Sequence, residues 1–192
     1  MSEIMLIRKF DKPVGVDYLH QATIALSWCR KLYGVDPVVH FLARDGQRCA
    51  CIFDAPDAEA VRNVIRTGGR SEPEAVWPCT VLPGTDDNGS SIPAGPDTAL
   101  VVVEYLHNDS PPGSDRLHTE VATPARTNGI RYLRSYVSND GLRAVSIFTE
   151  SNPGPVHEAH RVAGLKFNRL WMAHAIDGAS AKAELQPLES CR

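Results

Sequence analysis

Residues 34–41 read GVDPVVHF and residues 129–136 read GIRYLRSY, and each stretch is followed at the same distance by an Asp-Gly pair. The pairs are Asp45-Gly46 and Asp140-Gly141, in which glycine supplies the positive φ angle that a tight hairpin turn needs. A second apolar segment, a helical segment and a tryptophan-bearing strand then follow in both places. This repetition predicts two similar units in one chain.

The order of elements around each hairpin is βαββαβ, the ferredoxin-like arrangement. The apolar patterns predict strands at 5–10, 38–43, 48–53, 76–82, 100–106, 131–137, 142–148 and 169–176. Helices are expected at 17–33, 57–67, 114–128 and 155–163. The predicted division is a first unit at 1–83, a linker rich in proline and glycine at 84–97, a second unit at 98–178 and a flexible tail at 179–192.

Each predicted unit has a four-stranded antiparallel sheet whose helices lie on one face, so the other face needs a cover. In a duplicated chain the sheet of the other unit can provide it. The sequence therefore predicts an α+β fold of two tandem ferredoxin-like units that form an intramolecular pseudo-dimer, either as a closed barrel or as a sandwich of two sheets.

The composition narrows the functional classes. A net charge of -3 with scattered positive residues gives no reason to expect nucleic acid. No apolar run approaches the roughly 20 residues of a membrane helix, and no signal-peptide pattern opens the chain. Five cysteines, an odd number, favour reduced thiols and a cytoplasmic location. No glycine-rich phosphate loop or Rossmann fingerprint is present, so no nucleotide cofactor is expected.

Three segments resemble a small ferredoxin-like family typified by a nickel-responsive protein. They are the second hairpin from Gly129 to Asp140, the stretch from Cys51 to Arg62, and the helical segment from His157 to Leu165. The resemblance implies a cytoplasmic, dimer-forming protein that binds nickel or a similar divalent ion, and it does not imply catalysis. This chain departs from the family in being a fused tandem, so a metal site is expected in one unit only.

Two histidines, His157 and His160, stand three residues apart on a predicted helix and could face one ion. His174 is the favoured third ligand, and His107 and His118 are further candidates. Cys49 and Cys51 alternate on one strand and, with His40 on the paired strand, could form a second site with nitrogen and sulfur ligands. The alternatives are solvated histidines and cysteines that serve as small core residues.

The first functional prediction is a divalent-metal-binding protein, with nickel the preferred ion, that sequesters metal or assembles in response to it. The main rival is an enzyme of the dimeric α+β barrel type, which would act on a small hydrophobic or aromatic molecule as an isomerase, cyclase, monooxygenase or decarboxylase. Its candidate catalytic residues are His40, Tyr136 and Glu104, with Arg134 as another polar point. A third alternative is a non-catalytic module that binds a partner, and a homo-oligomer is compatible with all three.

Overall fold

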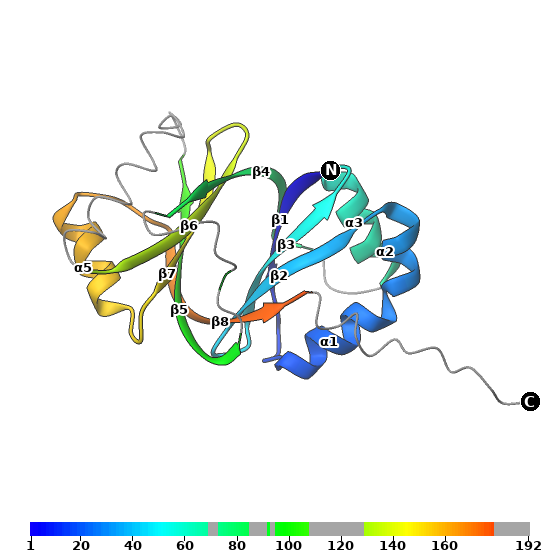
Figure 1. The fold of residues 1–192 in the computed structure, drawn as a ribbon, viewed down its shortest axis with the longest axis horizontal. Coiled ribbons are helices and arrows are strands. Elements are labelled where there is room, and N and C mark those ends of the chain that lie inside the picture. Colours follow the sequence, from blue (N-terminus) through cyan, green and yellow to red (C-terminus); the bar gives the residue numbers. More distant parts are fainter. Residues whose placement is uncertain (69–72, 85–91, 93–94, 108–128, 179–192) are drawn as a thin grey trace, which may run out of the picture. The chain divides into compact units, whose positions relative to one another are not determined.

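The computed structural model describes residues 1–68, 73–84, 92, 95–107 and 129–178 of the chain (Figure 1). Its elements are β1 (Ser2–Lys9), α1 (Val16–Ala25), α2 (Ser27–Tyr33), β2 (Asp36–Ala43), β3 (Arg48–Ala55), α3 (Ala58–Thr67), β4 (Ala75–Pro83), β5 (Gly95–Leu106), β6 (Arg131–Ser138), β7 (Arg143–Thr149), α5 (Gly154–Val162) and β8 (Arg169–Asp177). The chain divides into two compact units, of which the first comprises Met1–Val76 with the chain from Ile176, and the second comprises Trp77–Ala175.

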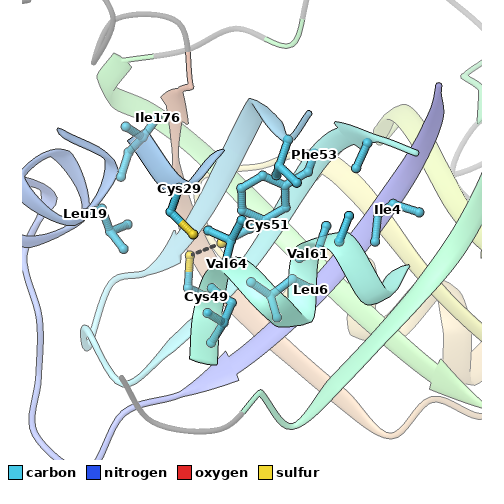
Figure 2. Close-up of a cluster of buried hydrophobic side chains, with 14 of the residues drawn as sticks. Ile4, Leu6, Leu19, Cys29, Cys49, Cys51, Phe53, Val61, Val64 and Ile176 are labelled. Atoms are coloured by element: carbon cyan, nitrogen blue, oxygen red, sulfur yellow. Dashed lines mark hydrogen bonds between the residues drawn. The ribbon is translucent and has the colours of Figure 1, made fainter. Parts of the chain in front are cut away.

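In the first unit the strands β1, β3 and β2 are hydrogen-bonded in that order, and all pairs are antiparallel. The hairpin between β2 and β3 turns at Gly46, whose φ of 70° confirms the Asp-Gly prediction. A side chain there is also excluded by space, because a Cβ atom would lie 2.5 Å from the carbonyl oxygen of Val14. Side chains of α1, α2 and α3 pack on one face of this sheet and form a buried core with Ile4, Leu6 and Phe53 (Figure 2).

Helix α3 begins as the sequence predicts. Its N-cap is Asp57, whose side chain accepts a hydrogen bond from the Ala60 backbone N–H at 2.8 Å. The single helix expected at 17–33 is instead two helices, because Leu26 has φ −96° and ψ 7° and breaks the regular backbone between α1 and α2. No side chain caps α1, and Asp17 lies in its first turn rather than at its N-cap.

In the described part of the second unit, five strands follow the order β8-β5-β7-β6-β4, and neighbouring strands are antiparallel. Helix α5 packs on one face of this sheet through Val156 and Ala159, against a core that includes Val101, Val103 and Phe148. The second Asp-Gly turn is also confirmed, since Gly141 has a φ of 71°.

The fold prediction needs a correction. It assigned each unit a separate four-stranded sheet, whereas the strands of the chain form one closed barrel in the order β1-β3-β2-β8-β5-β7-β6-β4. The physical reason lies in strand β4, which was predicted to close the first unit's own sheet. Its residues from Cys79 to Pro83 pair with Ser138 to Arg134 of β6, so β4 belongs to the sheet of the second unit. A pseudo-dimer of two independent ferredoxin-like units is therefore the wrong description, and a sandwich of two separate sheets is wrong as well.

Some predicted segments lie outside the described residues. They are the helix at 114–128, most of the linker at 84–97 and the tail from residue 179. Residues 95–97, which were assigned to the linker, are the first residues of β5.

Candidate functional site

The face of the second unit's sheet opposite α5 carries a group of polar and aromatic side chains. Val103 and Tyr105 belong to the core under α5, so Glu104, which lies between them, projects from the other face. The register places Trp171 opposite Val102 on this same face. The indole Nε1–H of Trp171 donates a hydrogen bond of 2.7 Å to Oε1 of Glu104.

Two residues of β6 complete this group. Val145 of β7 pairs with Glu104 on one side and with Tyr136 on the other, so Glu104 and Tyr136 occupy one row of the sheet, two strand spacings or about 10 Å apart. Arg134 precedes Tyr136 by two residues and shares its face. Tyr136 is buried, and Glu104, Arg134 and Trp171 are partly exposed. We call Glu104, Arg134, Tyr136 and Trp171 the Glu104 cluster.

The Glu104 cluster has groups suited to proton transfer on an apolar molecule. The Glu104 carboxylate can accept a proton, the Tyr136 phenol can donate one, and the Arg134 guanidinium can stabilise negative charge. Near the start of β4, Trp77 has the guanidinium of Arg143 at 5.6 Å from its ring centroid, which adds a second indole to this unit's sheet. The sequence identified Glu104, Tyr136 and Arg134 as polar points of such a site, and it offered Trp171 either as a residue lining a cavity or as part of the core.

The face under α5 contains a chain of buried hydrogen bonds. Nδ1 of His160 lies 2.7 Å from the carbonyl oxygen of Val156, which can only accept, so Nδ1 carries the proton and Nε2 is free to accept one. The Tyr105 hydroxyl lies 2.6 Å from Nε2 and therefore donates to it. Tyr105 accepts in turn from the Ser146 hydroxyl.

The same chain continues along the sheet. The hydroxyls of Ser146 and Ser135 are 2.5 Å apart, and the Tyr132 hydroxyl donates to Ser135 at 2.8 Å. Because the direction of the first bond is fixed at His160, the donors run in one sense, from Tyr132 through Ser135, Ser146 and Tyr105 to His160. We call these five residues the Tyr-Ser-His chain. None of these roles was predicted from the sequence, although Tyr105 could have been placed under α5 by its alternation with Val103.

Burial sets the protonation of this chain. It lowers the pKa of His160, an effect that the Val156 carbonyl opposes in part, so the imidazole is neutral. Burial also raises the pKa of Tyr105 far above its ordinary value, and it raises the pKa of Tyr132 to about 12. Every member is therefore neutral near pH 7, and the face under α5 holds a satisfied polar network without a charge.

The helix-covered face of the first unit differs in kind. Cys49 and Cys51 project from it side by side, with their sulfur atoms 3.4 Å apart (Figure 2). Their register partners on this face are Arg8 of β1, opposite Cys49, and His40 of β2, opposite Cys51. Arg8 and His40 are 4% and 5% exposed, and Nε and Nη2 of Arg8 lack a hydrogen-bond partner within the described part of the chain.

Each thiol of this group shifts the pKa of the other. The hydrogen bond with Cys49 lowers the pKa of Cys51 well below its usual value, against the effect of burial. The charge of His40, a hydrogen bond from His40 and the charge of Arg8 lower it further. The same hydrogen bond, together with burial, raises the pKa of Cys49. Cys51 is thus the more acidic of the two thiols. We call Arg8, His40, Cys49 and Cys51 the dithiol cluster.

The metal-site prediction needs a correction. Over the described ranges, no group of three His, Cys, Asp or Glu residues is placed to hold a metal ion. His160 is buried and uses both ring nitrogens, toward Val156 and Tyr105. His157 is exposed on α5 and meets the edge of Phe167 at 5.7 Å between ring centroids. The two histidines therefore do not share an ion, and the description of the protein as metal-binding or nickel-binding is not supported.

The remaining histidines named by the sequence lie elsewhere. His174 is on β8, and its partly buried ring has Nδ1 without a hydrogen-bond partner among the described residues. His107 follows β5 and stacks on Tyr105 with ring centroids 6.4 Å apart. His118 lies outside the described residues. A divalent-metal cofactor, the absence of a nucleotide cofactor and a homo-oligomer all stay predictions.

Comparison with known proteins gives a fold but no family. No family model and no curated protein matches the sequence. Among solved structures, the chlorite dismutase-like protein TA0507 matches with a TM-score of 0.50 and 11% identity over 96% of this chain and 98% of that one. The likeness shows that this chain shares the fold of that protein, and at such low identity it shows nothing more.

Two further structures match less well. An anthrone oxidase-like protein has a TM-score of 0.48 and 10% identity over 93% of this chain and 94% of its own. A monooxygenase-like protein from Lactobacillus acidophilus NCFM has a TM-score of 0.44 and 9% identity over 93% and 95%. The resemblance to the nickel-responsive family stays a prediction. Searched over the described residues, no helix has the length and apolar character needed to cross a membrane.

Proposed function

We propose that the protein is a barrel-type enzyme that acts on a small hydrophobic or aromatic molecule by proton transfer, with Glu104 as the general base. The observation that carries the proposal is the hydrogen bond of 2.7 Å from Trp171 to Glu104, which fixes a carboxylate beside an indole ring on the face opposite α5. A carboxylate held in this way has a fixed orientation on the sheet, which general-base catalysis requires.

The neighbours of Glu104 suit a substrate of this kind. Tyr136 lies in the same row of the sheet as Glu104, about 10 Å away across β7, so a proton acceptor and a proton donor share one face. Arg134 lies on the same face and can stabilise the anion that forms when Glu104 removes a proton. The sheet between them is apolar, with Val102, Val145 and Ile147 all buried, and it would contact the hydrocarbon part of the substrate.

The test is enzyme-dependent exchange of hydrogen for deuterium. A panel of aromatic ketones, phenols and hydroquinones that carry an acidic C–H bond is incubated in D₂O with the full-length protein, and deuterium uptake is followed by mass spectrometry. Wild-type protein is expected to accelerate exchange in at least one compound. Glu104→Gln should lower that rate by roughly 10²–10⁴-fold, because the amide cannot accept the proton.

The matched control is Glu158→Gln, which removes a carboxylate from the exposed surface of α5, where Glu158 pairs with Arg161. This variant should exchange the compound at the wild-type rate. The proposal fails if no compound of the panel exchanges faster than in buffer, or if Glu104→Gln is as active as the control.

A further inference from the structure

We propose that Cys49 and Cys51 are a peroxide-reactive dithiol, in which reversible oxidation closes a disulfide within strand β3. The inference rests on the dithiol cluster of the first unit and is independent of the Glu104 cluster. Three observations support it: the distance between the sulfur atoms, the two nitrogen-bearing side chains beside them and the helices that cover them.

The backbone holds the two cysteines at a separation that a disulfide can span with little adjustment. The residues are two apart on a strand and project from the same face, so their Cα atoms are about 6.6 Å apart. Disulfides occur up to about 6.8 Å between Cα atoms, so this pair lies near the upper limit. The sulfur atoms are already 3.4 Å apart. A bridge formed here would be strained, and strained bridges are the readily reduced ones.

The surroundings favour a reactive thiolate at Cys51. Arg8 is opposite Cys49, and its guanidinium is 4.9 Å from the ring centroid of Phe10, buried with two nitrogen atoms unpartnered in the described part of the chain. His40 is opposite Cys51 and has its ring edge toward Phe53 at 5.8 Å. Arg8 has no carboxylate partner among the residues that the structure describes, and such a buried guanidinium is costly. A thiolate beside it offsets that cost.

The helices that cover the two thiols determine which oxidants can reach them. Cys49 is 0% exposed and Cys51 is 3% exposed, beneath α1, α2 and α3. The chain breaks regular helix at Leu26, and α2 has only seven residues, so this part of the cover is built from short helices that open at low energy. Hydrogen peroxide is small and neutral and can reach the thiols through such an opening, whereas large or charged thiol reagents are excluded.

The two thiols are oxidised by hydrogen peroxide in two steps. The Cys51 thiolate attacks one oxygen of hydrogen peroxide, the O–O bond breaks, and the products are a Cys51 sulfenic acid and a hydroxide ion that takes a proton from solvent to give water. The Cys49 sulfur then attacks the Cys51 sulfur, the S–O bond breaks, and the hydroxyl leaves as water with the Cys49 proton. Two thiols are oxidised to one disulfide while one peroxide is reduced to two waters.

Figure 2 also shows Cys29 of α2 pointing toward the same pair. Its thiol is buried and could compete to form the bridge, so the experiment must distinguish the two products. Trypsin separates them, because Cys49 and Cys51 lie in one peptide, residues 49–62, and Cys29 lies in another that ends at Arg30. An intrastrand bridge leaves peptide 49–62 alone and two hydrogen atoms lighter, while a bridge to Cys29 joins two peptides.

The experiment uses the full-length protein with Cys191→Ser, so that this cysteine does not form bridges between molecules. The reduced protein is treated with a few equivalents of hydrogen peroxide, unfolded in the presence of iodoacetamide, digested and analysed by mass spectrometry. The expected result is an unalkylated peptide 49–62 that is lighter by two hydrogen atoms and that dithiothreitol restores. In Cys49→Ser, the sulfenic acid at Cys51 should persist and react with dimedone.

Arg8 provides the control on mechanism. Arg8→Met should slow oxidation at pH 7 about tenfold, the change that one unit of pKa makes to a thiolate population, and should move the pH profile of the rate upward. Arg8→Lys keeps the charge and should retain the wild-type rate within about threefold. Arg44→Met, which removes an exposed arginine of the same hairpin, should have no effect. The proposal is overturned if both thiols remain fully alkylated after peroxide, if Cys29 is found in the bridge, or if Arg44→Met and Arg8→Met slow the reaction equally.

Discussion

The two helix-covered faces occupy equivalent positions in the repeated hairpins, but they differ in whether their buried polar groups are hydrogen-bonded. His40 pairs with Cys51 in the first hairpin, and 95 residues later Ser135 pairs with Ser146 in the second. The neighbouring strands match as well, since Arg8 lies opposite Cys49 and Tyr105 lies opposite Ala144. Even the register irregularity recurs, after Pro37 in β2 and after Tyr132 in β6.

The difference lies in how completely the polar groups are satisfied. In the second unit the Tyr-Ser-His chain passes each hydroxyl hydrogen to a defined acceptor and ends on the neutral His160. In the first unit, two nitrogen atoms of Arg8 are buried without a hydrogen-bond partner among the described residues, beside two thiols in contact with each other. A satisfied network stabilises the fold, whereas an unsatisfied one stores free energy that chemistry can use. The comparison therefore assigns a structural role to one face and a reactive role to the other.

The largest expected effect comes from breaking the satisfied network at its end. His160→Ala removes a buried ring that contacts Phe148 and Phe167, and it leaves the Tyr105 hydroxyl without its acceptor. The free energy of unfolding should fall by about 3–5 kcal/mol, from the cavity and the lost hydrogen bond together. Urea denaturation followed by circular dichroism measures it. A loss below about 1 kcal/mol would show that the chain contributes little and that the contrast between the two faces is not energetic.

A second prediction concerns acid. The pKa of His160 is lowered from its ordinary value of 6.5 by burial, so the unfolded chain binds a proton that the folded chain does not. This contribution to stability is complete above pH 6.5 and is lost as the pH falls below that value toward the folded pKa. Urea midpoints measured from about pH 8 down to pH 5 should therefore decline, within the range in which histidines titrate.

The control for the acid effect is on the same helix. His160→Gln should flatten the decline, because glutamine does not titrate, while His157→Gln should leave it intact, since His157 is exposed. If both variants show the wild-type decline, the acid sensitivity arises elsewhere and His160 is not its source.

Local pattern was enough to predict the elements of the fold but not their partners. The hairpin turns, the Asp57 cap and the strand positions follow from glycine geometry, capping and alternation, which act over a few residues. The pairing of β4 with β6 is a contact between distant segments, and nothing in residues 75–83 records which strand they join. The break at Leu26 was missed for the opposite reason, because the apolar spacing of 17–33 is helical on both sides of it.

The candidate sites show the same limit. Alternation placed Glu104 opposite its neighbours and put Cys49 and Cys51 on one face, and the structure agrees on both points. The spacing of His157 and His160 suggested a shared ion, yet the structure buries one and exposes the other. Helical spacing of three residues fixes proximity but not which side of the helix faces the core. Arg8 was overlooked because it lies within an apolar strand, where an arginine is unusual enough to have been a signal.

The smallest expected effect, and the one that separates the two faces most clearly, comes from removing Arg8. Arg8→Met replaces a buried guanidinium that has two unpartnered nitrogen atoms in the described structure with an apolar side chain of similar length. The contact with Phe10 is lost, at a cost of about 0.5–2 kcal/mol, but the desolvation of the charge is relieved. The free energy of unfolding should therefore change by less than about 1 kcal/mol. It rises if the relieved desolvation of the charge exceeds the lost contact with Phe10.

Tyr105→Phe is the matched change at the equivalent place in the second unit, because both residues lie opposite the same position of their hairpins. It leaves Nε2 of the buried His160 ring without its hydrogen-bond donor and should lower the free energy of unfolding by about 1–3 kcal/mol. The two variants are compared in parallel by urea denaturation. If Arg8→Met is the more destabilising of the two, Arg8 is structurally satisfied by groups beyond its strand neighbours, and the dithiol cluster has no unbalanced charge to stabilise a thiolate.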